Sequence, residues 1–245
     1  MSLVEEKKCM QRDRKGACQN VFSHIAPIYD RMNFLISFGL IRSWCNRAAR
    51  YLALDVGEIG LDLGTGTADL AIAVMRISDR TAHMIGIDWA PEMLEQGYRK
   101  LHQPGFQDQI TLQHGNITSI ALPDNSIDRC GSAFLVRNLV NMDKCFREMW
   151  RVVRPGRSIV CLEVSHLSNV LLKILFHCYF YRIVPLFGTL LGQKFDAYQY
   201  LPASLKHFLD AFDLKKIMET SGWSDVHFYH LHGGLIAIHI GTKRF

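Results

Sequence analysis

Residues Ile59–Asp69 read Ile-Gly-Leu-Asp-Leu-Gly-Thr-Gly-Thr-Ala-Asp, and a second apolar run, Met84-Ile-Gly-Ile-Asp88, ends in an acid. Asp88 comes roughly 20 residues after Gly66, the distance at which a strand-end carboxylate holds ribose hydroxyls. An apolar strand, a glycine turn, a helical pattern and a second strand capped by a carboxylate form a nucleotide-binding βαβ unit. The stretch therefore predicts an α/β fold with a parallel sheet.

The charges around the glycine turn indicate which nucleotide binds there. Gly64 and Gly66 let the chain turn tightly, but Asp69 occupies the place of the third glycine of dinucleotide-binding turns. Asp62 before the turn and Asp88 beyond it add further negative charge. Such a site repels a pyrophosphate and attracts a cation. We therefore predict S-adenosylmethionine as the ligand, because it joins a sulfonium and an ammonium group to a ribose.

Length and composition narrow the class of protein. The chain has 245 residues, of which 49% are hydrophobic, and a formal net charge of +5, which suits one large domain with a sizeable core. Basic residues gather near both ends, where solvated termini explain them better than contact with anionic lipid or nucleic acid. Seven scattered cysteines without a C-x-x-C pair argue against disulfides and zinc, and residues 1–20 show no secretory signal. We expect a cytoplasmic protein with no metal and no nucleic-acid partner.

Strand and helix patterns alternate along most of the chain. We predict a charged arm over residues 1–18 and a single domain over 19–245, which opens with two or three helices before residue 53. Arg154-Pro-Gly156 is expected to end the last helix of the alternating region. Five strands are predicted near 58–63, 82–88, 109–114, 127–133 and 157–164. Helices are predicted near 68–78, 91–102 and 143–153, and the chain closes with a helix at 211–221 and antiparallel strands at 223–229 and 235–242.

Val170–Gly192 is an apolar, aromatic segment that follows the fifth predicted strand. Its length is near that of a membrane span, but three basic side chains and Pro185 interrupt it. Two interpretations stay open. Residues 170–205 form either a buried helical cap or a helical lid over an apolar pocket. In the second case, residues 170–192 can contact a bilayer surface.

Polar and aromatic residues follow the ends of the second and third predicted strands. Asp88 is expected to bind ribose, with a helix N-cap as the alternative role. Trp89 is a candidate to lie against an adenine face. Asn116, with the backbone of Ile117, is a candidate to read the adenine edge, and a simple turn residue is the alternative.

Arg137 and Asn138 follow the fourth predicted strand, where the methyl acceptor is expected. A methyltransferase that acts on DNA or on an amide nitrogen would show an Asn/Asp-Pro-Pro-aromatic turn at this place. The turn is absent, which disfavours a base substrate. Arg137 and Asn138 instead offer a guanidinium group and an amide to the acceptor. The alternative is that these two residues form only the exposed start of a helix.

Further motifs follow in order from about residue 20 to the end of the chain: Tyr29–Asn33, Ser37–Trp44, Leu122–Asn125, Phe134, Arg137-Asn138, Arg151–Gly156, Leu162–Ser165, Tyr200–Ser204 and Gly233–Gly241. They resemble the motifs of the UbiE/menaquinone-biosynthesis C-methyltransferases. The resemblance implies a class I S-adenosylmethionine-dependent methyltransferase fold, which is Rossmann-like with a seven-stranded, mostly parallel sheet, N-terminal helices and a helical insertion after the fifth strand. It also implies methyl transfer to a ring carbon of a polyprenylated quinol, with demethylmenaquinol as the first substrate to consider. Contact with the inner face of the membrane and a homodimer are further expectations.

The resemblance also assigns individual site residues. One family contact, often a serine, falls on Ala133, which lacks the hydroxyl group. Ala68 occupies a place commonly taken by glycine, and Arg157 replaces the second glycine after Pro155. The other cofactor contacts implied by the resemblance fall on Thr67, Asp88, Asn116 and Ile117.

Methylation of a quinol carbon requires that one phenol lose its proton and that carbon, methyl and sulfur lie in line. Arg137 is the candidate to stabilise the phenolate, directly or through water. Tyr29, Asp30 and Asn33 are expected to close over the site from the N-terminal helices. His239 is a candidate proton acceptor, although its alternating strand pattern also suits a structural role. Two rival hypotheses remain: methylation of another lipophilic small molecule, and a non-catalytic methyltransferase-like protein that binds the cofactor for regulation.

Overall fold

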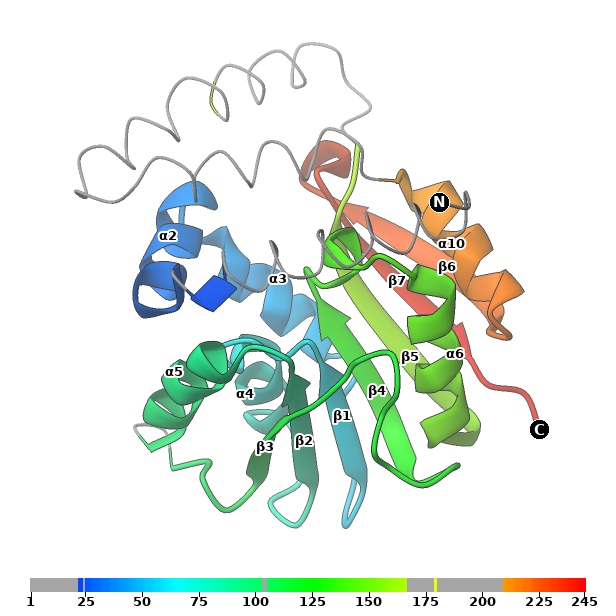
Figure 1. The fold of residues 1–245 in the computed structure, drawn as a ribbon. Coiled ribbons are helices and arrows are strands. Elements are labelled where there is room, and N and C mark those ends of the chain that lie inside the picture. The colour runs from blue at the N-terminus through cyan, green and yellow to red at the C-terminus, as the bar shows by residue number, and fades with distance from the viewer. Residues whose placement is uncertain (1–21, 24, 103–104, 167–178, 180–208) are drawn as a thin grey trace, which may run out of the picture.

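The computed structural model describes residues 22–23, 25–102, 105–166, 179 and 209–245. The predicted arm at 1–18 and the predicted insertion at 170–205, apart from Tyr179, lie outside these residues. The described residues form a seven-stranded sheet in the order β3-β2-β1-β4-β5-β7-β6, as Figure 1 shows. The predicted α/β fold with a seven-stranded, mostly parallel sheet is therefore confirmed.

Strands β1 to β5 pair in parallel, and β7, which lies between β5 and β6, pairs antiparallel with both. The strands are β1 (Ile59–Leu63), β2 (His83–Asp88), β3 (Ile110–His114), β4 (Ile127–Ala133), β5 (Val153–Val164), β6 (Ser224–Leu231) and β7 (Ile236–Thr242). The longer helices are α2 (Tyr29–Ile36), α3 (Leu40–Ala49), α4 (Asp69–Met75), α5 (Pro91–His102), α6 (Met142–Val152) and α10 (Ala211–Thr220). Short 3-10 turns are η1 (Ala26–Ile28), η2 (Val136–Asn138) and η4 (His232–Gly234).

Both faces of the sheet are covered, as a parallel sheet requires. Alternate residues of β5 supply the two faces: Val160 and Leu162 pack with α3 and α4, whereas Ile159 and Cys161 pack with α6 and α10. The period-2 alternation of a strand produces this division. Figure 1 shows α2 and α3 near the end of the sheet at which β4 finishes.

The stretch after α6 differs from the prediction. The helix ends at Val152, and the next residue, Val153, already pairs with Ile127 of β4. Pro155 and Gly156 therefore do not end the helix but lie inside β5, where the pairing with β4 shifts register. Gly156 supplies the positive φ of 76° that this irregularity needs.

Arginines of this stretch hold the amino-terminal edge of the sheet. Asp128 is buried and accepts hydrogen bonds from Ile59 N at 2.9 Å and from Arg154 Nη1 at 2.6 Å. Arg157 Nη1 lies 2.6 Å from Glu58 Oε1. Arg157, which departs from the family pattern, therefore takes part in an ion-pair network far from the glycine turn.

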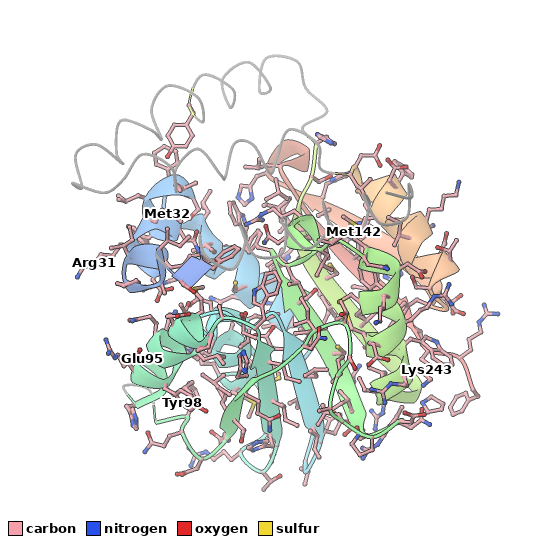
Figure 2. The ribbon with its side chains drawn as sticks, in the orientation of Figure 1. Arg31, Met32, Glu95, Tyr98, Met142 and Lys243 are labelled. Carbon is pink, nitrogen blue, oxygen red and sulfur yellow. The ribbon has the colours of Figure 1, made fainter. Side chains whose placement is uncertain are left out.

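Lys243 closes the other end of α6, opposite Met142, as Figure 2 shows. Its side chain is buried, and its Nζ donates to Trp150 O at 2.8 Å, Val153 O at 2.7 Å and Asn125 Oδ1 at 2.7 Å. The ammonium group also lies 3.9 Å from the centre of the Trp150 ring. One cation thus satisfies carbonyl groups that a helix C-terminus leaves without partners.

We expect Lys243→Met to lower the free energy of unfolding by about 2–3 kcal/mol, because charged hydrogen bonds are lost and buried carbonyls stay unpaired. Urea denaturation measures the change. Lys215→Met on α10 is the control, since Lys215 forms only a partly exposed pair with Glu219. Equal stability of the two variants would contradict the structural role of Lys243.

Candidate active site

The glycine turn joins β1 to α4 at the carboxyl edge of the sheet. Gly64 and Gly66 have φ of 71° and 53°, a conformation that favours glycine. A Cβ atom on Gly64 would lie 2.6 Å from Leu135 Cδ1. Asp88, at the end of β2, accepts from Gly66 N at 2.8 Å and from Ala90 N at 2.9 Å. Asp88 therefore connects the turn to the residue that precedes α5. Its bond to Ala90 N is not an N-cap contact, because it lies ahead of the first helical residue, Pro91.

Asp62 is a second acid under the turn. Its Oδ2 accepts from Thr65 Oγ1 at 2.7 Å and from Ala71 N at 3.2 Å, whereas its buried Oδ1 has no hydrogen-bond partner among the described residues. Burial raises the pKa of Asp62 to about 7, and the charges of Asp88 and Asp69 add to the effect. A buried acceptor without a hydrogen-bond partner costs free energy, so this oxygen is suited to accept a hydrogen bond from a ligand.

Two small cavities flank the glycine turn, and both are lined by Tyr29, Gly64, Gly66 and Phe134. The predicted cofactor residues that line one or both cavities are Asp62, Gly64, Gly66, Thr67, Asp88, Trp89, Ile117 and Ala133.

Asn116 does not line either cavity. Its Oδ1 accepts from both Thr118 N and Thr118 Oγ1, each at 3.0 Å. The structure thus favours the turn-residue alternative for Asn116, while its neighbour Ile117 does line a cavity.

A cluster of four side chains connects α2 to the cofactor side of the sheet. Lys100 Nζ lies 2.7 Å from Asp30 Oδ2 and 2.6 Å from Asp69 Oδ1. Thr67 Oγ1 donates to Asp30 Oδ1 at 2.6 Å and accepts from Lys100 Nζ at 3.1 Å. The negative charge of Asp69 is therefore paired with Lys100, which reduces its contribution to the acidic character predicted for the turn. Sequence reasoning missed Lys100.

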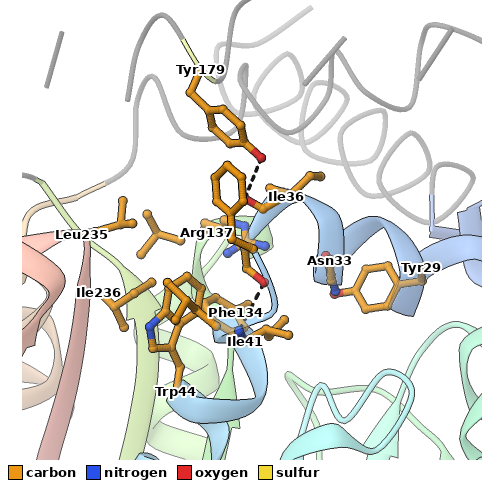
Figure 3. Close-up of a pocket in the computed structure, with 14 residues that line it drawn as sticks. Tyr29, Asn33, Ile36, Ile41, Trp44, Phe134, Arg137, Tyr179, Leu235 and Ile236 are labelled. Atoms are coloured by element: carbon orange, nitrogen blue, oxygen red, sulfur yellow. Dashed lines mark hydrogen bonds between the residues drawn. The ribbon is translucent and has the colours of Figure 1, made fainter. Parts of the chain in front are cut away.

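A third cavity, which is apolar, lies between α2, α3 and the ends of β5 and β7. Tyr29 and Phe134 line this cavity as well as both cavities at the glycine turn, so the three spaces adjoin. Trp44 forms part of its wall and donates from Nε1 to His232 Nδ1 at 3.0 Å. Figure 3 shows Trp44, Ile41 and Ile236 on one side of the cavity and Tyr29 and Asn33 on another.

Tyr179 also lines this apolar cavity. Its hydroxyl donates to Leu35 O at 3.1 Å, and its ring centre lies 4.8 Å from that of Phe38. The predicted apolar insertion therefore contributes one described residue to the wall.

Phe134 stands where the cavities meet. Its φ of 57° is unusual for a bulky residue, and its N–H donates to Leu162 O at 2.8 Å. The guanidinium carbon of Arg137 lies 5.4 Å from the Phe134 ring centre, and the Trp44 ring centre lies at 6.1 Å. Strained backbone is typical of functional sites. No motif in the sequence indicated this conformation.

Three of the four predicted catalytic residues gather at these cavities. Arg137 lines the apolar cavity, Asn138 lines a cavity beside the glycine turn, and Tyr29 lines all three. Burial raises the pKa of Tyr29, which the charge of Arg137 and a hydrogen bond with Asn33 partly offset. Glu163, whose Oε2 lies 3.6 Å from Arg137 Nη1, is a buried acid that sequence reasoning quoted in a motif without a role.

His239, the fourth predicted catalytic residue, lies elsewhere. It is buried in β7, pairs with Cys161 of β5, and its Nε2 donates to Ala211 O at 2.9 Å. Burial lowers its pKa to about 4. It lines none of the three cavities. The structure therefore favours the structural role of His239, because the alternation of β7 directs its side chain into the core; its role as proton acceptor stays a prediction.

A family model described as the ubiE/COQ5 methyltransferase family matches residues 8–243. The chain belongs to this family. A demethylmenaquinone methyltransferase of Lactiplantibacillus plantarum is 35% identical over 225 residues, which cover 92% of this chain and 95% of that protein. A ubiquinone/menaquinone biosynthesis C-methyltransferase UbiE of a Geobacter species is 35% identical, covering 91% and 94%. A solved SAM-dependent methyltransferase of Aquifex aeolicus shares the fold, with a TM-score of 0.61 and 16% identity over 86% of this chain and 96% of that one.

The described residues were considered for two further features, a membrane-spanning helix and a metal site. Within them, no helix has the length and apolar character needed to cross a membrane. In the same part of the chain, His, Cys, Asp and Glu side chains do not form a group of three or more suited to a metal ion.

We expect Lys100→Met to loosen α2 without unfolding the protein, because Asp30 and Asp69 then face each other without a cation. Hydrogen exchange followed by mass spectrometry should show faster exchange in residues 29–36, since local opening costs less free energy. Arg99→Met is the control, because Arg99 pairs only with exposed Glu95 on the same helix. Unchanged exchange in residues 29–36 would show that the cluster does not hold α2.

Proposed function

We propose that this ubiE/COQ5 family member transfers a methyl group from S-adenosylmethionine to a ring carbon of a polyprenylated quinol, with demethylmenaquinol as the first substrate. The observation that carries the proposal is the apolar cavity that meets an acidic glycine turn at Phe134 and Tyr29, with Arg137 in its wall. The names of the relatives from Lactiplantibacillus plantarum and Geobacter support the same substrate class.

The residues at the glycine turn fit this cofactor. The unpartnered Oδ1 of Asp62 suits an ammonium group, and each oxygen of Asp88 retains a lone pair for a ribose hydroxyl. Trp89 and Ile117 supply apolar surface for an adenine. When bound, S-adenosylmethionine supplies an electrophilic methyl group. Ala133 offers no side-chain hydrogen bond at its place in the wall.

The acceptor cavity carries the remaining chemistry. Its walls are mostly apolar, so few polar groups surround the quinol ring, which strengthens the effect of any charge nearby. Arg137 keeps a permanent positive charge and can stabilise the phenolate that makes a ring carbon nucleophilic. The raised pKa of Tyr29 keeps its hydroxyl neutral, so Tyr29 can close the site without adding negative charge.

Membrane contact through residues 170–192 and a homodimer remain predictions, since the described residues bear on neither. If residues 170–192 contact a bilayer, the protein should co-sediment with anionic vesicles less at high salt. The rival substrates are other lipophilic small molecules.

Transfer of labelled methyl from S-adenosylmethionine into reduced demethylated quinones, followed by mass spectrometry, tests the proposal. A panel of naphthoquinols and benzoquinols with different tail lengths identifies the substrate. Methylation of none of them would overturn the quinol assignment, and absence of cofactor binding in calorimetry would favour a non-catalytic protein.

We expect Asp62→Asn to weaken cofactor binding about 10- to 100-fold, because a charge-assisted hydrogen bond contributes roughly 1.5–3 kcal/mol. The asparagine keeps an oxygen for Thr65 and Ala71, so the turn should persist. Calorimetry measures the affinity, and Asp55→Asn, which removes an exposed acid, is the control.

The same measurement has a defined pH dependence. Since the pKa of Asp62 is raised to about 7, a cation must displace a proton from this group at lower pH. The affinity of the wild type should therefore rise between about pH 6 and pH 8, and Asp62→Asn should remove that part of the rise. A wild-type affinity that falls over this range would contradict the role of Asp62.

We expect Arg137→Met to leave cofactor affinity intact and to reduce turnover about 100-fold, or ~2.7 kcal/mol. The variant keeps the length of the side chain but loses the charge that stabilises the phenolate. A higher pH should partly restore its turnover, because bulk base then supplies the phenolate. Arg147→Met, which removes an exposed arginine of α6, is the control. Nearly normal turnover of Arg137→Met would limit Arg137 to a structural role.

A further inference from the structure

Glu163 is a buried acid near the end of β5 that faces Arg137, a residue of the apolar cavity wall. Its relative exposure is 0%, and it lines none of the three cavities. Its Oε1 accepts a hydrogen bond from Val136 N, in the same turn that carries Arg137. One oxygen of Glu163 therefore holds the backbone of this turn.

The other oxygen of Glu163 faces Arg137 but accepts no hydrogen bond from a described residue. Oε2 lies 3.6 Å from Arg137 Nη1, and neither atom has a hydrogen-bond partner among the described residues. The side-chain exposures are 1% for Glu163 and 9% for Arg137, so the pair is almost completely removed from water. A buried pair with such loose geometry is poor at stabilising a fold. A contribution to stability therefore does not explain why this pair is buried beside the cavity.

Among the residues that the structure describes, few other charges interact with Glu163. Arg137 from η2 is the cation that faces it, and Tyr29 from α2 lies beyond Arg137. Cys161 on the same strand interacts with its charge. On the neighbouring strand β7, the residue paired with Glu163 is Ala237. The charge state of this end of the cavity thus depends mainly on Arg137 and Glu163.

We propose that Glu163 is a positioning residue for methyl transfer, which holds the Arg137 guanidinium against the acceptor cavity and acts as its internal counter-ion. The inference rests on the proposed function. In the resting site the ionised pair is neutral, and the guanidinium is held between Glu163 and the ring of Phe134. Arg137 is then fixed before the substrate arrives, at no entropic cost during the reaction.

The counter-ion also controls how readily the phenolate forms. When the quinol O–H bond breaks, its electron pair stays on oxygen and the proton leaves to solvent. Ionised Glu163 repels this new negative charge, and the few polar groups between them screen the repulsion only weakly. Protonation of Glu163 relieves the repulsion, and burial, which raises the pKa of Glu163 to about 7, makes this feasible near neutral pH. Glu163 thus raises the pH at which the bound quinol ionises.

Glu163→Gln tests the proposal, because glutamine keeps an oxygen for Val136 N and removes the charge. We expect kcat to fall about tenfold, with KM and the cofactor Kd unchanged, since Arg137 is no longer held. We also expect the acid limb of the kcat profile to move to lower pH, because the repulsion of the phenolate is gone. Glu163→Asp keeps the charge but places it farther from Arg137, because the side chain is shorter. This variant should therefore have a lower kcat, while the acid limb of its kcat profile stays near that of the wild type.

A double-variant cycle separates action through Arg137 from a general structural role. In Arg137→Met the acid of Glu163 has lost its cation, so Glu163→Gln in that background should leave kcat unchanged or raise it. Independent, multiplying losses in kcat, or an unchanged acid limb in Glu163→Gln, would overturn the proposal. The wild type is assayed in parallel: if it methylates no quinol, the proposed function fails, and this inference fails with it. If the wild type is active and Glu163→Gln matches it in kcat and pH profile, only the role of Glu163 is refuted.

Discussion

The Asp88 carboxylate, which accepts hydrogen bonds from Gly66 N and Ala90 N, joins two loops that are far apart in the sequence. It brings the turn after β1 against the start of α5, so the cavities beside the turn depend on it. Buried carboxylates need such donors, because burial alone favours the protonated form; burial does raise the pKa of Asp88. The same acid that shapes the turn is the one proposed to bind ribose. Shape and ligand affinity at this site therefore rest on one side chain.

Charge is distributed unequally around Phe134. On the cofactor side, Asp62 keeps a buried oxygen without a partner, whereas the charge of Asp69 is matched by Lys100. On the acceptor side, Arg137 faces the apolar cavity. A cationic donor and an acceptor that becomes anionic need opposite electrostatic surroundings. The arrangement at Phe134 supplies both in adjoining cavities.

The N-terminal helices complete this space. Helices α2 and α3 cover part of the carboxyl edge of the sheet, since Tyr29, Ile41 and Trp44 line the apolar cavity. Their attachment depends on contacts with distant elements: Lys100 of α5 holds Asp30, and His232 of η4 accepts from Trp44. A substrate site built from an added helical layer can change while the cofactor half of the fold stays the same.

The sequence by itself determined the order of strands and helices, the glycine turn and the acid at the end of β2, because these depend on local periodicity and on backbone conformations that glycine allows. It also indicated Arg137 and Tyr29, through their motifs. The tertiary structure alone decided that Lys100 pairs with Asp69, that Asn116 holds a turn, that His239 faces the core and that Glu163 lies behind Arg137. These outcomes depend on side-chain direction and on partners from other elements. Such contacts leave no periodic signal, because they arise only when the sheet and its helices pack.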